Sequence, residues 1–67
     1  MKAKNAIIGA KVMIKKYSRF YLGTPSNPIS SVGTISYIKA QGLPIHVSWE
    51  GGGHNSYNYE DLKLVKE

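Results

Sequence analysis

The sequence predicts an all-β fold, a single small barrel of five antiparallel strands with a long loop after the first strand and a short helical turn before the last. Apolar and polar residues alternate with a period of two from Ile45 to Trp49 and again from Asn55 to Tyr59. Gly51 to Gly53 separate these two runs, as expected for a β-hairpin. Other short alternating runs are bounded by turn residues, and short antiparallel strands with one apolar face are best closed into a barrel.

The predicted hairpin has one face for the core and one for solvent. If the three glycines form the loop, the facing pairs are Glu50 with His54, Trp49 with Asn55, Val47 with Tyr57 and Ile45 with Tyr59. Because side chains alternate between faces, the inner face carries Ile45, Val47, Trp49, Asn55, Tyr57 and Tyr59. The outer face carries His46, Ser48, Glu50, His54, Ser56 and Asn58.

The first half of the chain supplies one strand and a long loop. Residues 10–15 alternate between small or apolar and charged side chains, which predicts a strand with Val12 and Ile14 inward. Residues 16–31 are rich in glycine, proline, asparagine and serine, which predicts an irregular loop. Its expected anchors are Tyr17, Phe20, Tyr21, Leu22 and Ile29. A long loop in a small domain is often where binding occurs.

The remaining strands follow from similar signals. Residues 32–39 predict a strand with Ile35 and Tyr37 on one face and with a bend or close approach at Gly33. Residues 41–44 then turn the chain into the hairpin. Glu60 and Asp61 interrupt the alternation in a short helical turn or cap, and residues 62–66 predict the last strand.

Length and composition predict one domain over residues 1–67, in which residues 1–5 fray. So short a chain can bury only a small core, and assembly into a homo-oligomer would bury further surface. There is no cysteine, no convincing targeting signal and no apolar run long enough for a membrane span. We therefore expect a cytoplasmic protein with no membrane partner.

The motifs of the second half resemble those of a known group of folds. Val47-Ser48-Trp49-Glu50-Gly51, followed by Asn55-Ser56-Tyr57 and Asp61-Leu62-Lys63-Leu64, is similar to the Mind-bomb/HERC repeat and more loosely to Tudor and KOW domains. The resemblance spans about residues 9–65 and implies an SH3-like barrel. A protein of this kind could be an accessory protein of a phage or bacterium. It specifies the fold better than the ligand.

Charge favours a nucleic-acid or other polyanion ligand. Nine Lys or Arg against four Asp or Glu give a formal charge of +5. Cations would neutralise phosphates while exposed rings stack on bases. The candidate nucleic-acid-binding residues are Lys11, Lys15, Lys16, Tyr17, Arg19, Phe20, Tyr21 and Lys39. Solubility and core packing are the competing interpretation of this cluster. The alternative function is protein interaction or assembly through the 17–30 loop.

Other chemistry has weaker support in the sequence. In the predicted register His46 and His54 lie roughly 13 Å apart, which is too far to share a metal ion. The adjacent carboxylates of Glu60 and Asp61 have no spacing suited to acid and base catalysis. No nucleophile has a partnered base. The plasmid-borne type of dihydrofolate reductase resembles this chain in size and barrel, but its Val-Gln-Ile-Tyr stretch has no match here. We expect no enzyme, no catalytic residues, no metal and no cofactor.

Overall fold

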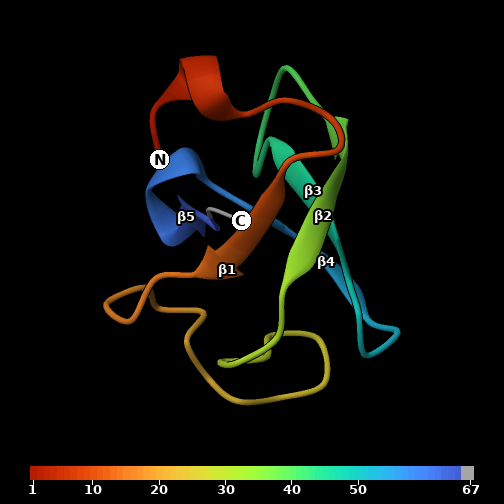
Figure 1. Cartoon of the computed structure of the whole chain (residues 1–67). Coiled ribbons are helices and arrows are strands. Elements are labelled where there is room, and N and C mark those ends of the chain that lie inside the picture. Colours follow the sequence, from red (N-terminus) through yellow and green to blue (C-terminus); the bar gives the residue numbers. More distant parts are fainter. Residues whose placement is uncertain (66–67) are drawn as a thin grey trace.

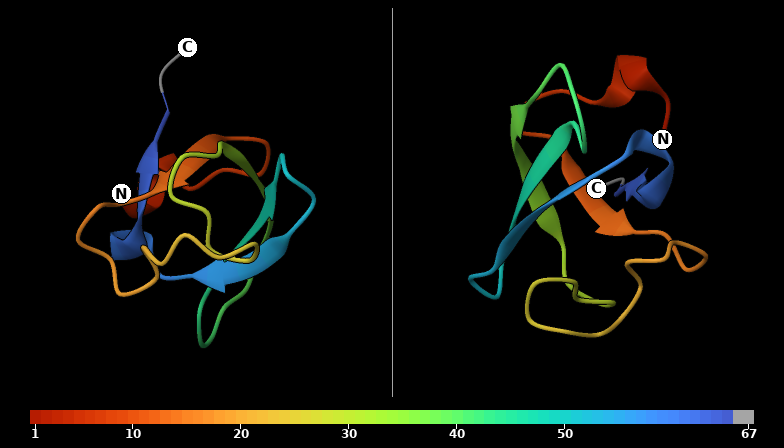
Figure 2. Two further views of the ribbon diagram at one scale, coloured as in Figure 1. Left: turned by 90° about the horizontal axis from the view of Figure 1, so that it is seen from below. Right: turned by 180° about the vertical axis from the view of Figure 1, so that it is seen from behind.

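The computed structural model of the chain describes residues 1–65 and confirms the all-β prediction. Its strands are β1 (Lys11–Ile14), β2 (Gly33–Ile38), β3 (Ile45–Trp49), β4 (His54–Tyr57) and β5 (Leu62–Leu64), and its 3-10 turns are η1 (Ala3–Asn5) and η2 (Tyr59–Asp61). The strands form one antiparallel sheet in the order β4-β3-β2-β1-β5 (Figure 1). The sheet curls into a small SH3-like barrel, and η2 joins its two outermost strands (Figure 2).

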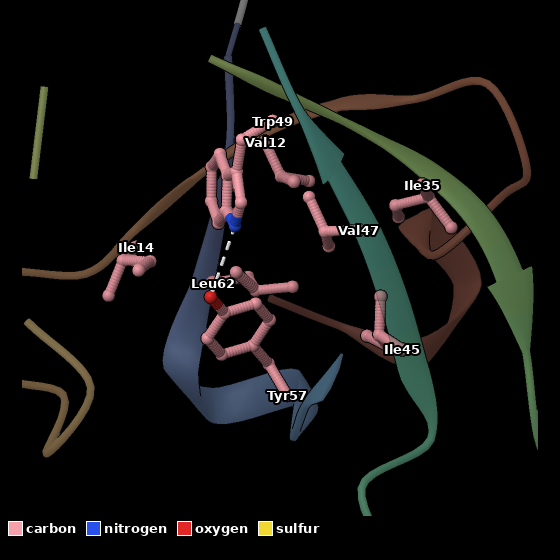
Figure 3. Packing of buried hydrophobic residues seen from close by; sticks show 8 residues of the cluster. All are labelled: Val12, Ile14, Ile35, Ile45, Val47, Trp49, Tyr57 and Leu62. Carbon is pink, nitrogen blue, oxygen red and sulfur yellow. Dashed lines mark hydrogen bonds between the residues drawn. The ribbon is translucent and has the colours of Figure 1, made fainter. Parts of the chain in front are cut away.

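The core lies where the alternating pattern places it. Every strand contributes to it, and Figure 3 shows the packed side chains. They are Val12, Ile14, Ile35, Ile45, Val47, Trp49, Tyr57 and Leu62. Burial of these eight side chains supplies the main driving force for folding.

Gly33 is required because the indole of Trp49 packs on it. The two residues face each other across β2 and β3. A Cβ at Gly33 would lie 2.6 Å from Cε3 of Trp49 and would also overlap Val47. The close approach expected at Gly33 is therefore present, and both Val47 and the tryptophan ring cause it.

The predicted hairpin register is wrong by two residues. The observed pairs are Ile45 with Tyr57, His46 with Ser56, Val47 with Asn55 and Ser48 with His54. The loop comprises residues 50–52, since Trp49 N donates to Gly53 O at 2.7 Å and Gly52 N donates to Trp49 O at 2.9 Å. Gly52 adopts a φ of 104°, a conformation that glycine reaches without strain. A shift of two residues leaves every side chain on its predicted face.

The register change brings the two histidines together. His46 and His54 stack on the outer face with ring centroids 5.7 Å apart and an interplanar angle of 25°. The expected separation of roughly 13 Å was wrong because it placed His46 opposite Asn58 instead of Ser56.

A β-bulge in β2 overturns the predicted orientation of Tyr37. The pairing with β3 shifts between Ile35 and Tyr37, so that Ile35 faces Val47 while Tyr37 faces His46. Ile35 is fully buried, whereas Tyr37 is 55% exposed. The extra residue in the bulge turns Tyr37 to the outer face, where the simple alternation had placed Ser36.

The helical turn before β5 is a capped element. Asn58 and Asp61 form a reciprocal capping box around η2, and the backbone N–H of Asn58 donates to Oδ2 of Asp61 at 3.1 Å. Tyr59, predicted as a strand residue opposite Ile45, belongs to this turn and packs partly against the core. The tyrosine keeps its core role in a different element.

The amino terminus lies close to this turn. The amino nitrogen of Met1 donates to Tyr59 O at 2.7 Å and to Leu62 O at 3.1 Å. Fraying of residues 1–5 stays a prediction. Neither helical segment within residues 1–65 is long and apolar enough to cross a membrane.

Candidate polyanion-binding surface

Two consecutive turns give residues 15–21 a defined backbone. Ser18 N donates to Lys15 O at 3.0 Å, and Tyr21 N donates to Ser18 O at 3.1 Å. The side chain of Ser18 accepts a further bond from Phe20 N at 3.0 Å. Ser18 is thus the local centre of the segment that carries most of the predicted ligand-binding residues.

Asp61 fastens this segment to the barrel. Its Oδ1 accepts a 2.9 Å hydrogen bond from the Ser18 hydroxyl, and its backbone oxygen accepts one of 2.8 Å from Lys15 N. Only 6% of Asp61 is exposed. Hydrogen bonds to an ionised acceptor are stronger than neutral ones, so a buried carboxylate is well suited to hold the loop.

The two aromatic residues that end the segment are supports rather than free contact surfaces. Phe20 meets Tyr57 edge to face with ring centroids 5.3 Å apart. Both Phe20 and Tyr21 are partly buried against the core. The guanidinium of Arg19 lies over the Phe20 ring, 4.9 Å from its centroid, which holds this cation at the surface.

Tyr17 differs from them because nothing in the barrel covers it. The side chain is 95% exposed, and Lys16 and Arg19 on either side of it are also exposed. Lys15 is partly buried. We call Lys15, Lys16, Tyr17 and Arg19 the basic loop surface.

A groove of about 440 Å³ runs beside this surface and mixes both signs of charge. Its lining residues are Lys15, Tyr17, Ser18, Arg19, Asn58, Glu60 and Asp61. The acidic residues near the C-terminus, remote from the lysines in the sequence, are therefore adjacent to them in space. Asp61 is buried and accepts the hydrogen bond from Ser18, whereas Glu60 is the exposed acidic residue of the groove.

The structure separates the other two predicted cations from this group. Lys11 lies in β1, where its Nζ donates to Oγ1 of Thr34 at 2.7 Å. Lys39 follows the last residue of β2, and because β1 and β2 are antiparallel, this end of β2 lies opposite to the end of β1 that leads into the 15–21 loop. Of the eight predicted residues, Lys15, Tyr17 and Arg19 line one groove and Lys16 is their exposed neighbour in the sequence. Phe20 and Tyr21 pack against the core, and Lys11 and Lys39 lie apart.

The later part of the loop is tied to the core through Tyr57. Thr24 and Asn27 pair in a tight turn, and the Tyr57 hydroxyl contacts Ser26 O at 2.8 Å and Asn27 Oδ1 at 2.9 Å. Burial raises the pKa of the Tyr57 hydroxyl above its usual value. Gly53 lies directly against this turn, since a Cβ there would be 2.6 Å from Pro25 O.

Sequence reasoning did not assign Ser18, Asn58 and Asp61 to the site. Asn58 followed three residues later by Asp61 is a capping-box pattern, and that signal was available. Nothing in the sequence pairs Ser18 with Asp61 across 43 residues. Within residues 1–65, no three His, Cys, Asp or Glu side chains gather as a metal site.

Comparison with known proteins supports the fold alone. No protein-family model matches the sequence, and no curated protein matches it. Among solved structures, the chain is similar to the NMR structure of Bacillus subtilis protein YorP, with a TM-score of 0.68 and 19% sequence identity. The match covers 91% of this chain and 70% of YorP.

Proposed function

We propose that this domain is a non-catalytic binding module that binds nucleic acid or another polyanion through the basic loop surface. The observation that supports this most strongly is the 95% exposure of Tyr17 on a segment whose backbone is held in place. Tyr17 adds little to the stability of the barrel, and it stands between cations.

The chemistry of the surface fits a strand of phosphates and bases. Lysine and arginine neutralise phosphates, and release of counterions makes such binding depend on salt. An exposed aromatic ring offers a base a stacking surface worth about 1–3 kcal/mol. Since the loop is already ordered by Asp61, little conformational entropy is lost when a ligand binds.

Glu60 limits where the ligand can lie. A phosphate in the groove would approach this exposed carboxylate as well as Lys15. We infer that the phosphates contact Lys16 and Arg19, the two exposed cations that flank Tyr17 in the sequence and that we call the rim.

Charge reversal at the rim tests the proposal. Fluorescence anisotropy with labelled single-stranded DNA, single-stranded RNA and duplex DNA is measured for the wild type and for Lys16→Glu/Arg19→Glu. The matched control is Lys4→Glu/Lys63→Glu, which changes the net charge equally at two other exposed positions. The rim variant should bind about tenfold more weakly than the control, and its salt slope should fall by roughly 1.4 to 1.8. Equal losses in both variants, or binding that does not respond to salt, would contradict the proposal.

Substitution of Tyr17 distinguishes the contribution of stacking to binding from that of charge. Tyr17→Ala should weaken binding to single strands more than to duplex, because only unpaired bases can stack on the ring. Tyr37→Ala serves as the control, since Tyr37 is also exposed but lies on the outer face of β2. If both variants bind single strands equally well, Tyr17 does not stack on bases.

A second candidate function is protein interaction through the 17–30 loop. Leu22 is 61% exposed and Ile29 is 42% exposed, and a Cβ at Gly23 between them would contact Ile29 at 3.9 Å. The double variant Leu22→Ser/Ile29→Ser tests this function without changing Phe20 or Tyr21, which support the core. Sedimentation of the wild type and of this variant would show whether the chain associates with itself through these side chains. A monomer at all concentrations would exclude assembly of this chain with itself.

A further inference from the structure

The outer face of the β3–β4 hairpin holds two imidazoles in close contact. The rings of His46 and His54 lie 5.7 Å apart between centroids and are within 25° of parallel. His46 is partly buried and His54 is exposed. These two residues take no part in the core or in the basic loop surface.

The backbone pairing explains the contact. His46 faces Ser56 and His54 faces Ser48, so the histidines occupy diagonal positions on neighbouring strands. Diagonal side chains on one face of an antiparallel pair are within reach when they are long or aromatic. Because β3 also pairs with β2 on its other side, the strand that carries His46 is held from both edges.

A hydrogen bond orients His46 within the pair. Its Nδ1 lies 2.8 Å from the Ser56 hydroxyl oxygen. This contact occupies Nδ1 and leaves Nε2 as the nitrogen available to a ligand. Metal-binding histidines commonly have their second ring nitrogen hydrogen-bonded in this way, because the bond fixes the ring orientation.

We propose that His46 and His54 form a bidentate site for one divalent transition-metal ion, with water completing the coordination. Two imidazoles that share an ion at a metal–nitrogen distance of about 2.1 Å have ring centres roughly 5–6 Å apart. The observed 5.7 Å falls in this range, and because the rings are now nearly parallel, they must turn about their side-chain bonds until a nitrogen of each points at the same ion.

The donor set selects the class of ion. Imidazole suits Cu²⁺, Ni²⁺ and Zn²⁺, whereas Mg²⁺ and Ca²⁺ prefer oxygen ligands. Two nitrogen ligands without a third protein donor among residues 1–65 make a surface site from which the ion exchanges. By the usual order of stability, Cu²⁺ binds more tightly than Ni²⁺ or Zn²⁺.

Calorimetric titration of the full chain with NiCl₂ tests the proposal. The wild type should bind one equivalent, and His46→Gln or His54→Gln should weaken binding about tenfold or more, since the second imidazole acts at high effective concentration. His54→Gln/Lys63→His retains two histidines but places them on β3 and β5, which β2 and β1 separate in the sheet. This variant should bind as weakly as the single substitutions. Wild-type affinity in either single variant or in the displaced pair would overturn the proposal.

The same titration followed with ZnCl₂ by NMR tests the geometry. Side-chain nitrogen resonances of both histidines should shift together and saturate at one ion per chain. Ser56→Ala should bind Ni²⁺ more weakly than the wild type while keeping one equivalent, because the ring of His46 loses its orienting bond. Shifts confined to one ring, or a metal-bridged dimer in sedimentation, would contradict chelation within one chain. Neither result concerns the basic loop surface, so the metal site and the proposed function are tested independently of each other.

Discussion

The indole nitrogen of Trp49 donates a 3.2 Å hydrogen bond to the hydroxyl of Tyr57 inside the barrel (Figure 3). The rings meet edge to face with centroids 5.8 Å apart, an arrangement that aromatic pairs favour. The same hydroxyl contacts Ser26 O and Asn27 Oδ1. One oxygen atom thus connects the core of the hairpin to the long loop.

Removal of this hydroxyl should destabilise the fold. Tyr57→Phe leaves the buried indole N–H without its acceptor and releases the turn at Ser26, and we expect a loss of about 1–3 kcal/mol. Urea unfolding at pH 7 measures the change. Tyr37→Phe, at an exposed position, should stay within about 0.5 kcal/mol of the wild type. Equal effects from the two variants would show that the buried network contributes nothing.

The stability of the fold should fall in alkali because of Tyr57. Desolvation raises the pKa of Tyr57 in the folded state above the usual value of 10.0, so the unfolded state ionises first. The contribution of the neutral hydroxyl is complete below pH 10 and decreases as the pH rises through the folded-state pKa. The stability advantage of the wild type over Tyr57→Phe, measured by urea unfolding, should therefore shrink above pH 10. An advantage that grows with pH would contradict the assignment.

Gly33 should tolerate no side chain. Gly33→Ala places a methyl group against the rings of Trp49 and the side chain of Val47, and overpacking of this kind costs about 1–3 kcal/mol. Thermal unfolding monitored by tryptophan fluorescence reports both stability and the setting of the indole. The control is Gly51→Ala, whose Cβ would have no neighbour within 4 Å. Matching melting temperatures for the two variants would disprove the close packing.

The faces of the strands could be predicted from the sequence, because alternation has a period of two and an apolar face must be buried. Val12, Ile14, Val47, Trp49 and Tyr57 are all buried as expected. The closing turn before the last strand also followed from the break in alternation at Glu60 and Asp61.

Register and bulges could not be predicted in the same way. A hairpin loop at 50–52 and one at 51–53 place every side chain on the same face of the sheet, so the alternating pattern cannot distinguish the two registers. The distance between His46 and His54 depends on that choice. The bulge that exposes Tyr37 has no residue signal, since Ser36 and Tyr37 read as ordinary alternation.

The candidate surface was only partly predictable for a related reason. Composition identifies a basic and aromatic segment, but only tertiary contacts show that Phe20 and Tyr21 face the core while Tyr17 faces solvent. The position of Glu60 beside Lys15 is likewise a consequence of the barrel joining distant parts of the chain.

Glu60 should oppose polyanion binding. Glu60→Gln removes an exposed negative charge from the groove, and we expect about 2- to 5-fold tighter oligonucleotide binding at low salt. The gain should diminish as salt is added. Glu50→Gln makes the same change in net charge outside the groove and should have a smaller effect, as measured by anisotropy. A larger gain from Glu50→Gln would place the ligand elsewhere.

The most direct test of the proposed function is an NMR titration of the ¹⁵N-labelled chain with a short single-stranded oligonucleotide at low salt. We predict that amide shifts concentrate at Lys15 to Tyr21, that the ring signals of Tyr17 move with them, and that added salt reverses both. Shifts centred on residues 22–29, or no shifts at millimolar oligonucleotide, would contradict polyanion binding by the basic loop surface.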